Sequence, residues 1–169
     1  MAKVLFIIAP HGFRDEELLK PKEICEAAGF KTEIVSTRKG EATGMLGAKI
    51  KVSKNLLAVN ISDYQAIIFV GGTGAREYFE DALALAIAEE AVRQNKVLAA
   101  ICIAPSILAN AGVLRSRRAT AYPSEKDNLQ AKGARYTGEP VTVDGKIITA
   151  SGPETATEFG WKIVELLQK

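Results

Sequence analysis

The sequence predicts a doubly wound α/β fold, in which a mostly parallel sheet carries helices on both faces and small antiparallel additions. Short runs that are apolar throughout, such as Lys3–Ala9 and Val97–Ile101, are typical of strands buried on both faces. These runs alternate with amphipathic stretches of helical periodicity. No internal repeat and no long Pro/Gly/Ser linker interrupts the 169 residues, so a single domain spanning residues 1–169 is expected.

The N-terminal half is expected to supply three parallel strands, two helices and a small antiparallel excursion. Gly29 stands where a helix that begins at Asp15 would need a left-handed residue to end. Three glycines and a polar–apolar alternation mark the antiparallel excursion. In chain order, the expected elements are a strand at Lys3–Ala9, a helix at Asp15–Ala28, a strand at Thr32–Ser36, the excursion at 40–52, a strand at Gln65–Val70 and a helix at Tyr78–Gln94.

The C-terminal half is expected to add a parallel strand, further helices and a hairpin. Asp144-Gly145 is the strongest local hairpin signal in the chain, and Gly112 closes a short helix. The expected elements are a strand at Val97–Ile101, a helix at Pro105–Ala111, a short strand near Arg118–Ala121, a polar helix at Ser124–Lys132, hairpin strands at Val141–Val143 and Lys146–Thr149, and an amphipathic helix at Glu154–Leu167. Together these elements describe a flavodoxin-like sandwich.

The composition excludes several classes of protein. Hydrophobic residues make up 47% and charged residues 25%, and the net charge is +2, which argues against disorder, nucleic-acid binding and an anionic membrane surface. The apolar runs are too short to span a membrane, and Met1-Ala2-Lys3 leads directly into a strand without a signal peptide. Two cysteines cannot form a disulfide framework, so a reducing, cytoplasmic location is expected.

The ligand site of such a fold is expected at the carboxyl ends of the strands, which here means the loops Pro10–Asp15, Gly71–Glu77 and Cys102–Ala104. Cys102 follows a buried strand directly and precedes a helix, the geometry of a nucleophile elbow. Free amides of the first helical turn would lower the pKa of its thiol, and the amide of Ile103 could donate to an oxyanion. The residues alone leave open the alternative that Cys102 is a small packed core residue.

Glu17 is the second candidate, because it heads an apolar line on the first helix with Pro21, Ile24 and Ala28. Burial there would raise the pKa of its carboxyl group, so that it could hold a proton for donation. The alternative is an acid that merely favours the helix N-terminus. Cys25 lies mid-helix on a packing stripe and is interpreted as a core residue.

Gly71-Gly72-Thr73-Gly74 follows a buried strand but lacks the spacing of a phosphate-binding loop. A flavodoxin-like nucleotide- or flavin-binding domain is therefore the weakest interpretation. The glycines instead allow the backbone to approach a ligand closely and to present the amide of Gly72. His11, the only histidine, lies in the first loop and is either near the site or solvated. One histidine and a mid-helix cysteine do not assemble a metal site by spacing, so neither metal nor cofactor is expected.

At this point the sequence resembles the ThiJ/PfpI superfamily, which includes PfpI-like intracellular proteases and deglycase-type proteins. The resemblance runs through the whole chain. The matching residues are Glu17, Gly71-Gly72, Ala99-Ala100-Ile101-Cys102, Ala104-Pro105, Ala111-Gly112-Val113-Leu114, Tyr122-Pro123, Lys126-Asp127, Asp144-Gly145, Thr149, Gly152-Pro153 and Glu158-Phe159.

The resemblance implies a role for each matched site residue. Cys102 would be the nucleophile, Glu17 the carboxyl group bonded to its sulfur, and the amides of Gly72 and Ile103 the oxyanion hole. Tyr122 stands where PfpI-like members have a tyrosine beside the site. Ile103 replaces the histidine that follows the nucleophile in PfpI-type members, which disfavours peptidase activity. The deglycase-like branch instead has a histidine at the Tyr122 position and an arginine near Ser151.

The function expected from residues and resemblance together is a cysteine-dependent, cofactor-independent enzyme that acts on small reactive aldehydes or their protein adducts. Its partners would be a small carbonyl substrate or a glycated protein, and the resemblance implies a homo-oligomer, dimeric or larger. One alternative is a cysteine hydrolase of the PfpI type, a peptidase or amidase. The other is a non-enzymatic redox sensor or chaperone-like stress protein that uses an oxidisable Cys102.

Overall fold

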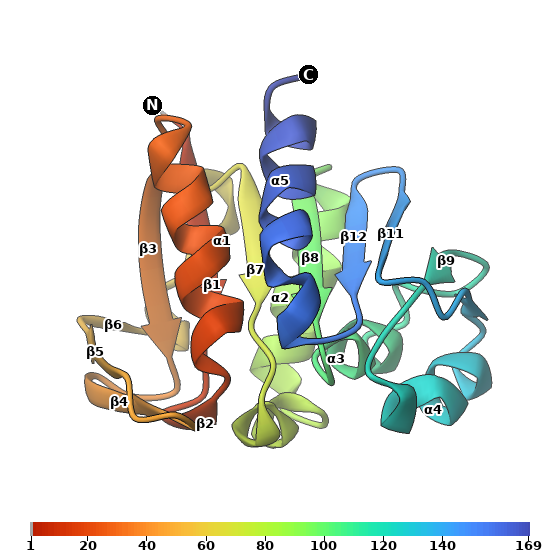
Figure 1. The fold of residues 1–169 in the computed structure, drawn as a ribbon, viewed down its shortest axis with the longest axis horizontal. Helices are drawn as coiled ribbons and strands as arrows, with labels where there is room; N and C mark the ends of the chain where they lie inside the picture. The colour runs from red at the N-terminus through yellow and green to blue at the C-terminus, as the bar shows by residue number, and fades with distance from the viewer. Residues whose placement is uncertain (1) are drawn as a thin grey trace.

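The computed structural model describes residues 2–169. A seven-stranded sheet lies at the centre of the fold (Figure 1). Every neighbouring pair in this sheet is parallel except the pair at one edge, β11 and β12, which is antiparallel. In spatial order, the strands are β11 (Val141–Asp144), β12 (Ile147–Ala150), β8 (Val97–Ile101), β7 (Ala66–Phe69), β1 (Lys3–Ile7), β3 (Lys31–Ser36) and β6 (Lys54–Asn55). The predicted mostly parallel α/β fold is confirmed.

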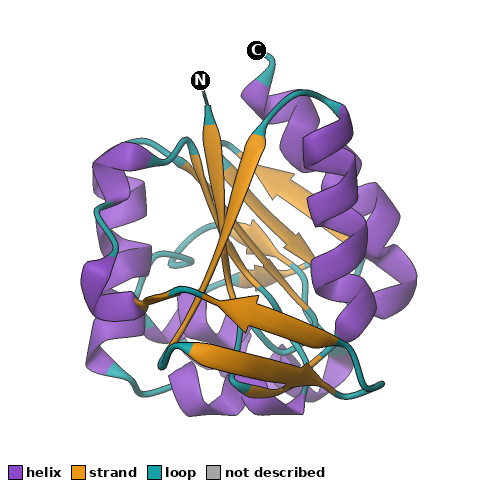
Figure 2. Cartoon of the chain, turned by 90° about the vertical axis from the view of Figure 1, so that its left-hand side faces the viewer, coloured by secondary structure: helices purple, strands orange, loops and turns teal. Residues whose placement is uncertain are grey.

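Helices cover both faces of the sheet (Figures 1 and 2). One face carries α1 (Asp15–Ala27) and α5 (Ala156–Leu167), and the other carries α2 (Ala82–Arg93) and α3 (Pro105–Asn110). The buried residues of β1 explain this arrangement, because Val4 and Phe6 belong to the core under α1 and α5, whereas Leu5 and Ile7 belong to the other core. Alternate side chains of a strand point to opposite faces, so a wholly apolar strand requires a layer on each side.

Helices α1 and α5 lie against each other at Gly160. A Cβ atom on this glycine would lie 3.0 Å from Cα of Pro21 and 2.9 Å from Cδ1 of Ile24. The missing side chain therefore lets the two helices approach closely. Cys25 is fully buried in the core beside them, which confirms its interpretation as a packing residue.

A second, three-stranded sheet stands at the carboxyl ends of the parallel strands, along the lower edge of Figure 1. It consists of β2 (His11–Phe13), β4 (Gly40–Gly44) and β5 (Lys49–Val52). β4 and β5 pair antiparallel, which confirms the predicted excursion, and β2 joins them parallel to β4. The sequence did not predict β2, because three residues are too few to show a periodicity.

Three helices begin later than predicted, and each is preceded by a 3-10 turn. α2 begins at Ala82, not Tyr78, because the Asp81 side chain caps it by accepting the amide of Ala84 at 2.9 Å. The other two are α4 (Lys126–Ala131) and α5. The 3-10 turns that precede the three helices are Thr73–Tyr78, Pro123–Glu125 and Pro153–Thr155. Outside the two larger sheets, β9 (Arg118–Ala119) and β10 (Arg135–Tyr136) form a two-stranded parallel pair. In the described residues, no helix has the length and apolar character needed to cross a membrane.

Candidate active site

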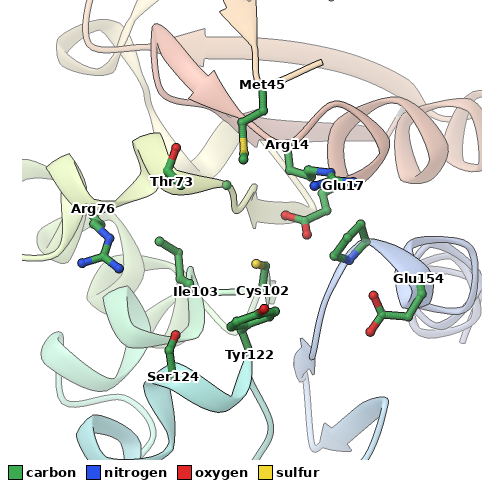
Figure 3. Close-up of a pocket in the computed structure, with 12 residues that line it drawn as sticks. Arg14, Glu17, Met45, Thr73, Arg76, Cys102, Ile103, Tyr122, Ser124 and Glu154 are labelled. Carbon is green, nitrogen blue, oxygen red and sulfur yellow. The ribbon is translucent and has the colours of Figure 1, made fainter. Parts of the chain in front are cut away.

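Cys102 lies on the tight turn between β8 and α3. Its φ of 66° is in the left-handed region, which side-chain-bearing residues seldom adopt and which functional sites often hold under strain. The amide of Cys102 donates to the carbonyl of Ala150 at 2.9 Å, and its carbonyl accepts the amide of Tyr122 at 2.8 Å. These two bonds hold the turn in place, and the thiol consequently projects into the pocket shown in Figure 3.

Glu17 lies in the first turn of α1 and points its carboxyl group toward Cys102 (Figure 3). The side chain is fully buried, and within residues 2–169 neither carboxyl oxygen has a hydrogen-bond partner. A buried polar group without a partner costs stability, so its retention needs an explanation. This orphaned carboxyl group faces the Cys102 thiol.

Burial raises the pKa of Glu17 to about 8. The Cys102 thiol, the charge of Arg14 and the backbone of Gly71 all lower this pKa, but their combined influence is smaller than that of burial. At neutral pH the carboxyl group is therefore mainly protonated, and it can donate its proton to the sulfur or to a bound oxygen.

The pKa of the Cys102 thiol is raised to about 12, first by burial and second by the negative charge of Glu17. The amides of Gly72 and Ile103 both lower it, as the sequence suggested, but burial outweighs them. The expectation of a lowered thiol pKa is therefore wrong. Protonation of Glu17 removes the repelling charge, so the thiolate is favoured when the carboxyl group holds the proton.

The backbone amides of Gly72 and Ile103 both lower the pKa of the Cys102 thiol as hydrogen-bond donors. Gly72 has a φ of 103°, and a Cβ there would lie 2.5 Å from the carbonyl oxygen of Gly12 and overlap the amide nitrogen of Arg14. Only glycine fits this position. Two amides aimed at one point are the arrangement that can stabilise a developing oxyanion.

These groups line a cavity of about 470 Å³ above the thiol (Figure 3). Tyr122 stands at its mouth with 48% of its surface exposed. His11 is exposed, lies outside this cavity, and its Nε2 atom is 2.8 Å from Nη2 of Arg38. The lining residues are Arg14, Glu17, Met45, Gly72, Thr73, Arg76, Cys102, Ile103, Tyr122, Ser124, Pro153 and Glu154.

Sequence reasoning placed Arg76 in a predicted site loop but missed Met45, Ser124, Pro153 and Glu154 as pocket residues. The last two could have been found, because the strand that precedes them also ends at the carboxyl edge of the sheet. No such sequence pattern pointed to Met45, because this residue lies on the turn between β4 and β5 of the second sheet and does not follow a strand of the main sheet. In the described part of the chain, no group of three or more His, Cys, Asp or Glu side chains could hold a metal ion.

Gly71 separates Glu17 from Cys102, and its replacement by alanine is expected to impair both activity and stability. The new Cβ would lie 2.5 Å from Oε1 of Glu17 and 2.6 Å from Cβ of Cys102. Such overpacking costs about 1–3 kcal/mol and displaces the two reacting groups. Urea unfolding together with thiol alkylation kinetics measures both effects.

Gly112→Ala serves as the reference for Gly71→Ala. Gly112 has a φ of 82° but open space around the position of a Cβ, so only backbone strain of about 1–2 kcal/mol is expected there. Wild-type alkylation kinetics in Gly71→Ala would contradict the steric argument.

The fold and site place the chain in a known class: it belongs to the DJ-1/PfpI family, whose model matches residues 2–166. This finding confirms the resemblance to the ThiJ/PfpI superfamily. Among relatives, an uncharacterised protein from Methanocaldococcus jannaschii is 44% identical, over 99% of this chain and 83% of that protein. A deglycase from Pyrococcus horikoshii is 32% identical, over 98% of this chain and 99% of that protein.

Solved structures of the family show the same fold. A ThiJ/PfpI domain protein from Brachyspira murdochii aligns with a TM-score of 0.96 at 30% identity, covering 98% of this chain and 96% of that chain. Drosophila melanogaster DJ-1beta aligns with a TM-score of 0.88, also at 30% identity, covering 99% of this chain and 91% of that chain. Several relatives are thus named deglycases or DJ-1 proteins.

Proposed function

We propose that this protein is a cysteine-dependent enzyme that acts on small reactive aldehydes or on their protein adducts, without a cofactor. The observation that carries the proposal is the position of Cys102, which faces a buried, unpartnered Glu17 within the described residues and two convergent amides. The Pyrococcus relatives named deglycases support the same class of substrate.

The first step on methylglyoxal is addition of the Cys102 sulfur to the aldehyde carbon. The S–C bond forms while the C=O π electrons move to oxygen, and the amides of Gly72 and Ile103 stabilise the resulting negative charge. Cys102 reacts as the thiolate, and the protonated Glu17 delivers its proton to that oxygen. The product is a neutral hemithioacetal, and Glu17 is left as a carboxylate.

The second step moves a proton between the two carbons. The Glu17 carboxylate removes the proton from the former aldehyde carbon, and the electrons of that C–H bond form the C=C bond of an enediolate with its charge on the neighbouring oxygen. The hydroxyl proton on the former aldehyde carbon's oxygen passes to this neighbouring oxygen. Glu17 then returns its proton to the neighbouring carbon as the C=O bond forms at the former aldehyde carbon, which gives a lactoyl thioester on Cys102. Water cleaves this thioester to lactate and free thiol. Methylglyoxal plus water has the composition of lactic acid, so no oxidant or reductant is consumed.

A panel of substrates tests the proposal: methylglyoxal, glyoxal, a methylglyoxal-modified peptide and an unmodified peptide. Lactate formation in D₂O, followed by proton NMR, is expected for methylglyoxal, with solvent deuterium at the carbon that Glu17 reprotonates to the extent that the Glu17 proton exchanges with solvent before it returns. Hydrolysis of the unmodified peptide without aldehyde turnover would replace the proposal by the peptidase alternative. Ile103 in place of a histidine, and a His11 that faces Arg38, weigh against that outcome.

A redox role for Cys102 is the second candidate. Cys102 is partly exposed in the cavity, whereas Cys25 is fully buried, so a mild oxidant reaches Cys102 first. A Toxoplasma gondii DJ-1 structure, 30% identical with a TM-score of 0.88, is described as oxidized. A stable gain of 32 Da on Cys102 after dilute peroxide, with no aldehyde turnover, would favour the sensor.

We also propose that the protein works as a cytoplasmic homo-oligomer, dimeric or larger. The resemblance to the superfamily supports the assembly, and the use of two free cysteines supports a reducing compartment. Light scattering coupled to size exclusion measures the assembly, and a monomer across micromolar concentrations would contradict it.

A further inference from the structure

We propose that Met45 is a specificity-determining residue, which forms an apolar wall across from Cys102 and favours 2-oxoaldehydes whose far end is apolar. The inference rests on the proposed aldehyde chemistry. It states which kind of group the site favours at the end of the substrate that lies away from the reacting carbon. Asp15 is proposed as the positioning residue that holds this wall.

Met45 comes from the turn between β4 and β5, far from the thiol in sequence. Its side chain lines the cavity and points down toward Cys102 (Figure 3), and 42% of its surface is exposed. Ile103 borders the same space from α3's side of the cavity. A substrate bound through its aldehyde carbon to the sulfur would therefore extend toward a thioether and an aliphatic chain.

The Met45 backbone is fixed at several points. Its amide donates to the carbonyl of Phe13 at 2.8 Å. The carboxylate of Asp15, only 6% exposed, accepts the amide of Leu46 at 2.9 Å and that of Ala48 at 2.8 Å. Gly44 leaves room for this carboxylate, since a Cβ there would lie 2.6 Å from its Cγ. The turn is thus clamped to the first turn of α1, which also carries Glu17.

Charged side chains also line the cavity. Arg14 is bound twice by Glu16, with Nε–Oε1 and Nη2–Oε2 distances of 2.9 and 3.0 Å. Arg76 and Glu154 stand on opposite sides of the thiol in Figure 3. A methyl or phenyl group packed on Met45 gains from leaving water, whereas the second aldehyde of glyoxal does not. Methionine is unbranched and adapts to groups of different size.

The role of Met45 is tested by comparing kcat/KM for three substrates: glyoxal, methylglyoxal and phenylglyoxal. The wild type is expected to prefer methylglyoxal and phenylglyoxal over glyoxal by about tenfold or more, the range that one apolar group supplies in a pocket. Met45→Gln keeps the length of the side chain and is expected to remove most of this preference through KM. Met45→Leu is expected to retain it.

Leu46→Gln is the matched control, because Leu46 lies on the same turn, is 64% exposed and does not line the cavity. Its substrate preference is expected to equal that of the wild type. An unchanged preference in Met45→Gln, with turnover still dependent on Cys102, would overturn the assignment of Met45 and leave the proposed function intact. Absence of aldehyde turnover in the wild type would overturn both.

Asp15→Ala tests the clamp. It is expected to lower the preference to the level of Met45→Gln, and the double variant Asp15→Ala/Met45→Gln is expected to lose no more. Asp15→Asn keeps one acceptor oxygen and is expected to restore part of the preference. Additive losses in the double variant would show that Asp15 acts on the preference independently of Met45, and would overturn its positioning role.

Discussion

Replacement of Cys102 by alanine is expected to lower lactate formation from methylglyoxal by about a thousandfold or more, the scale on which loss of a nucleophile acts. No bond to the aldehyde carbon can form without the sulfur, and the carboxyl group of Glu17 and the two amides then have nothing to act on. The turn itself keeps its shape, because its hydrogen bonds to Ala150 and Tyr122 use only the backbone of residue 102. Product NMR and the thermal unfolding midpoint together measure the two effects.

Cys25→Ala is the matched control, since the chain offers a second thiol outside the site. Cys25 is fully buried and burial raises the pKa of its thiol to about 12. Its removal is expected to leave kcat/KM unchanged and to cost about 1 kcal/mol of stability for the small cavity. Turnover by Cys102→Ala equal to the wild type would eliminate the covalent mechanism.

Glu17→Gln is expected to lower turnover by about a hundredfold or more, because glutamine cannot carry a proton between the two carbons of the substrate. The amide is nearly isosteric with the carboxyl group, so binding is expected to change less than kcat. Deuterium incorporation from D₂O should fall together with the rate. Retention of both would assign the proton transfer to another group.

The same variant is expected to change the pH dependence of stability. The folded-state pKa of Glu17, about 8, lies above its ordinary value of 4.5, so the folded state binds the proton more tightly than the unfolded state. The contribution is therefore fully present below about pH 4.5 and is lost as the pH rises through about 8. Each unit of such a difference corresponds to about 1.4 kcal/mol.

Urea unfolding at pH 5, 7 and 9 measures this contribution. The wild type is expected to lose stability over this range relative to Glu17→Gln, which has no proton to lose at this position. Glu16→Gln is the control, because Glu16 is a half-buried residue of the same turn and its bond to Arg14 lowers the pKa of its carboxyl group. This variant should not remove the loss. Parallel profiles for wild type and Glu17→Gln would contradict a proton held by Glu17 in the folded state.

The sequence predicted the parts of the site that depend on local pattern. A wholly apolar strand followed directly by Cys102 and then Pro105 indicates a strand–turn–helix junction, and the structure has that junction. Glu17 was identified because it heads a line of apolar residues on one face of the first helix, and it is fully buried. Both signals lie within a few residues of the side chain concerned.

The parts that could not be predicted depend on contacts between distant segments. Met45 reaches the cavity only because β4 pairs with the three-residue strand β2, and no local periodicity encodes that pairing. The pKa of the thiol was misjudged for a related reason. One amide donor, Ile103, is the next residue and the other, Gly72, follows the neighbouring parallel strand, so both can be inferred from the sequence, whereas the burial of the thiol arises from the packing of the whole sheet edge.

The bond between the Cys102 amide and the Ala150 carbonyl has a consequence for synthesis of the chain. The carboxyl group at position 17 and the sulfur at position 102 leave the ribosome long before β12 does. Until residues 147–150 emerge, the thiol turn lacks the neighbouring strand that fixes it. The nascent chain therefore carries an unassembled thiol turn until the last strand of the sheet is completed.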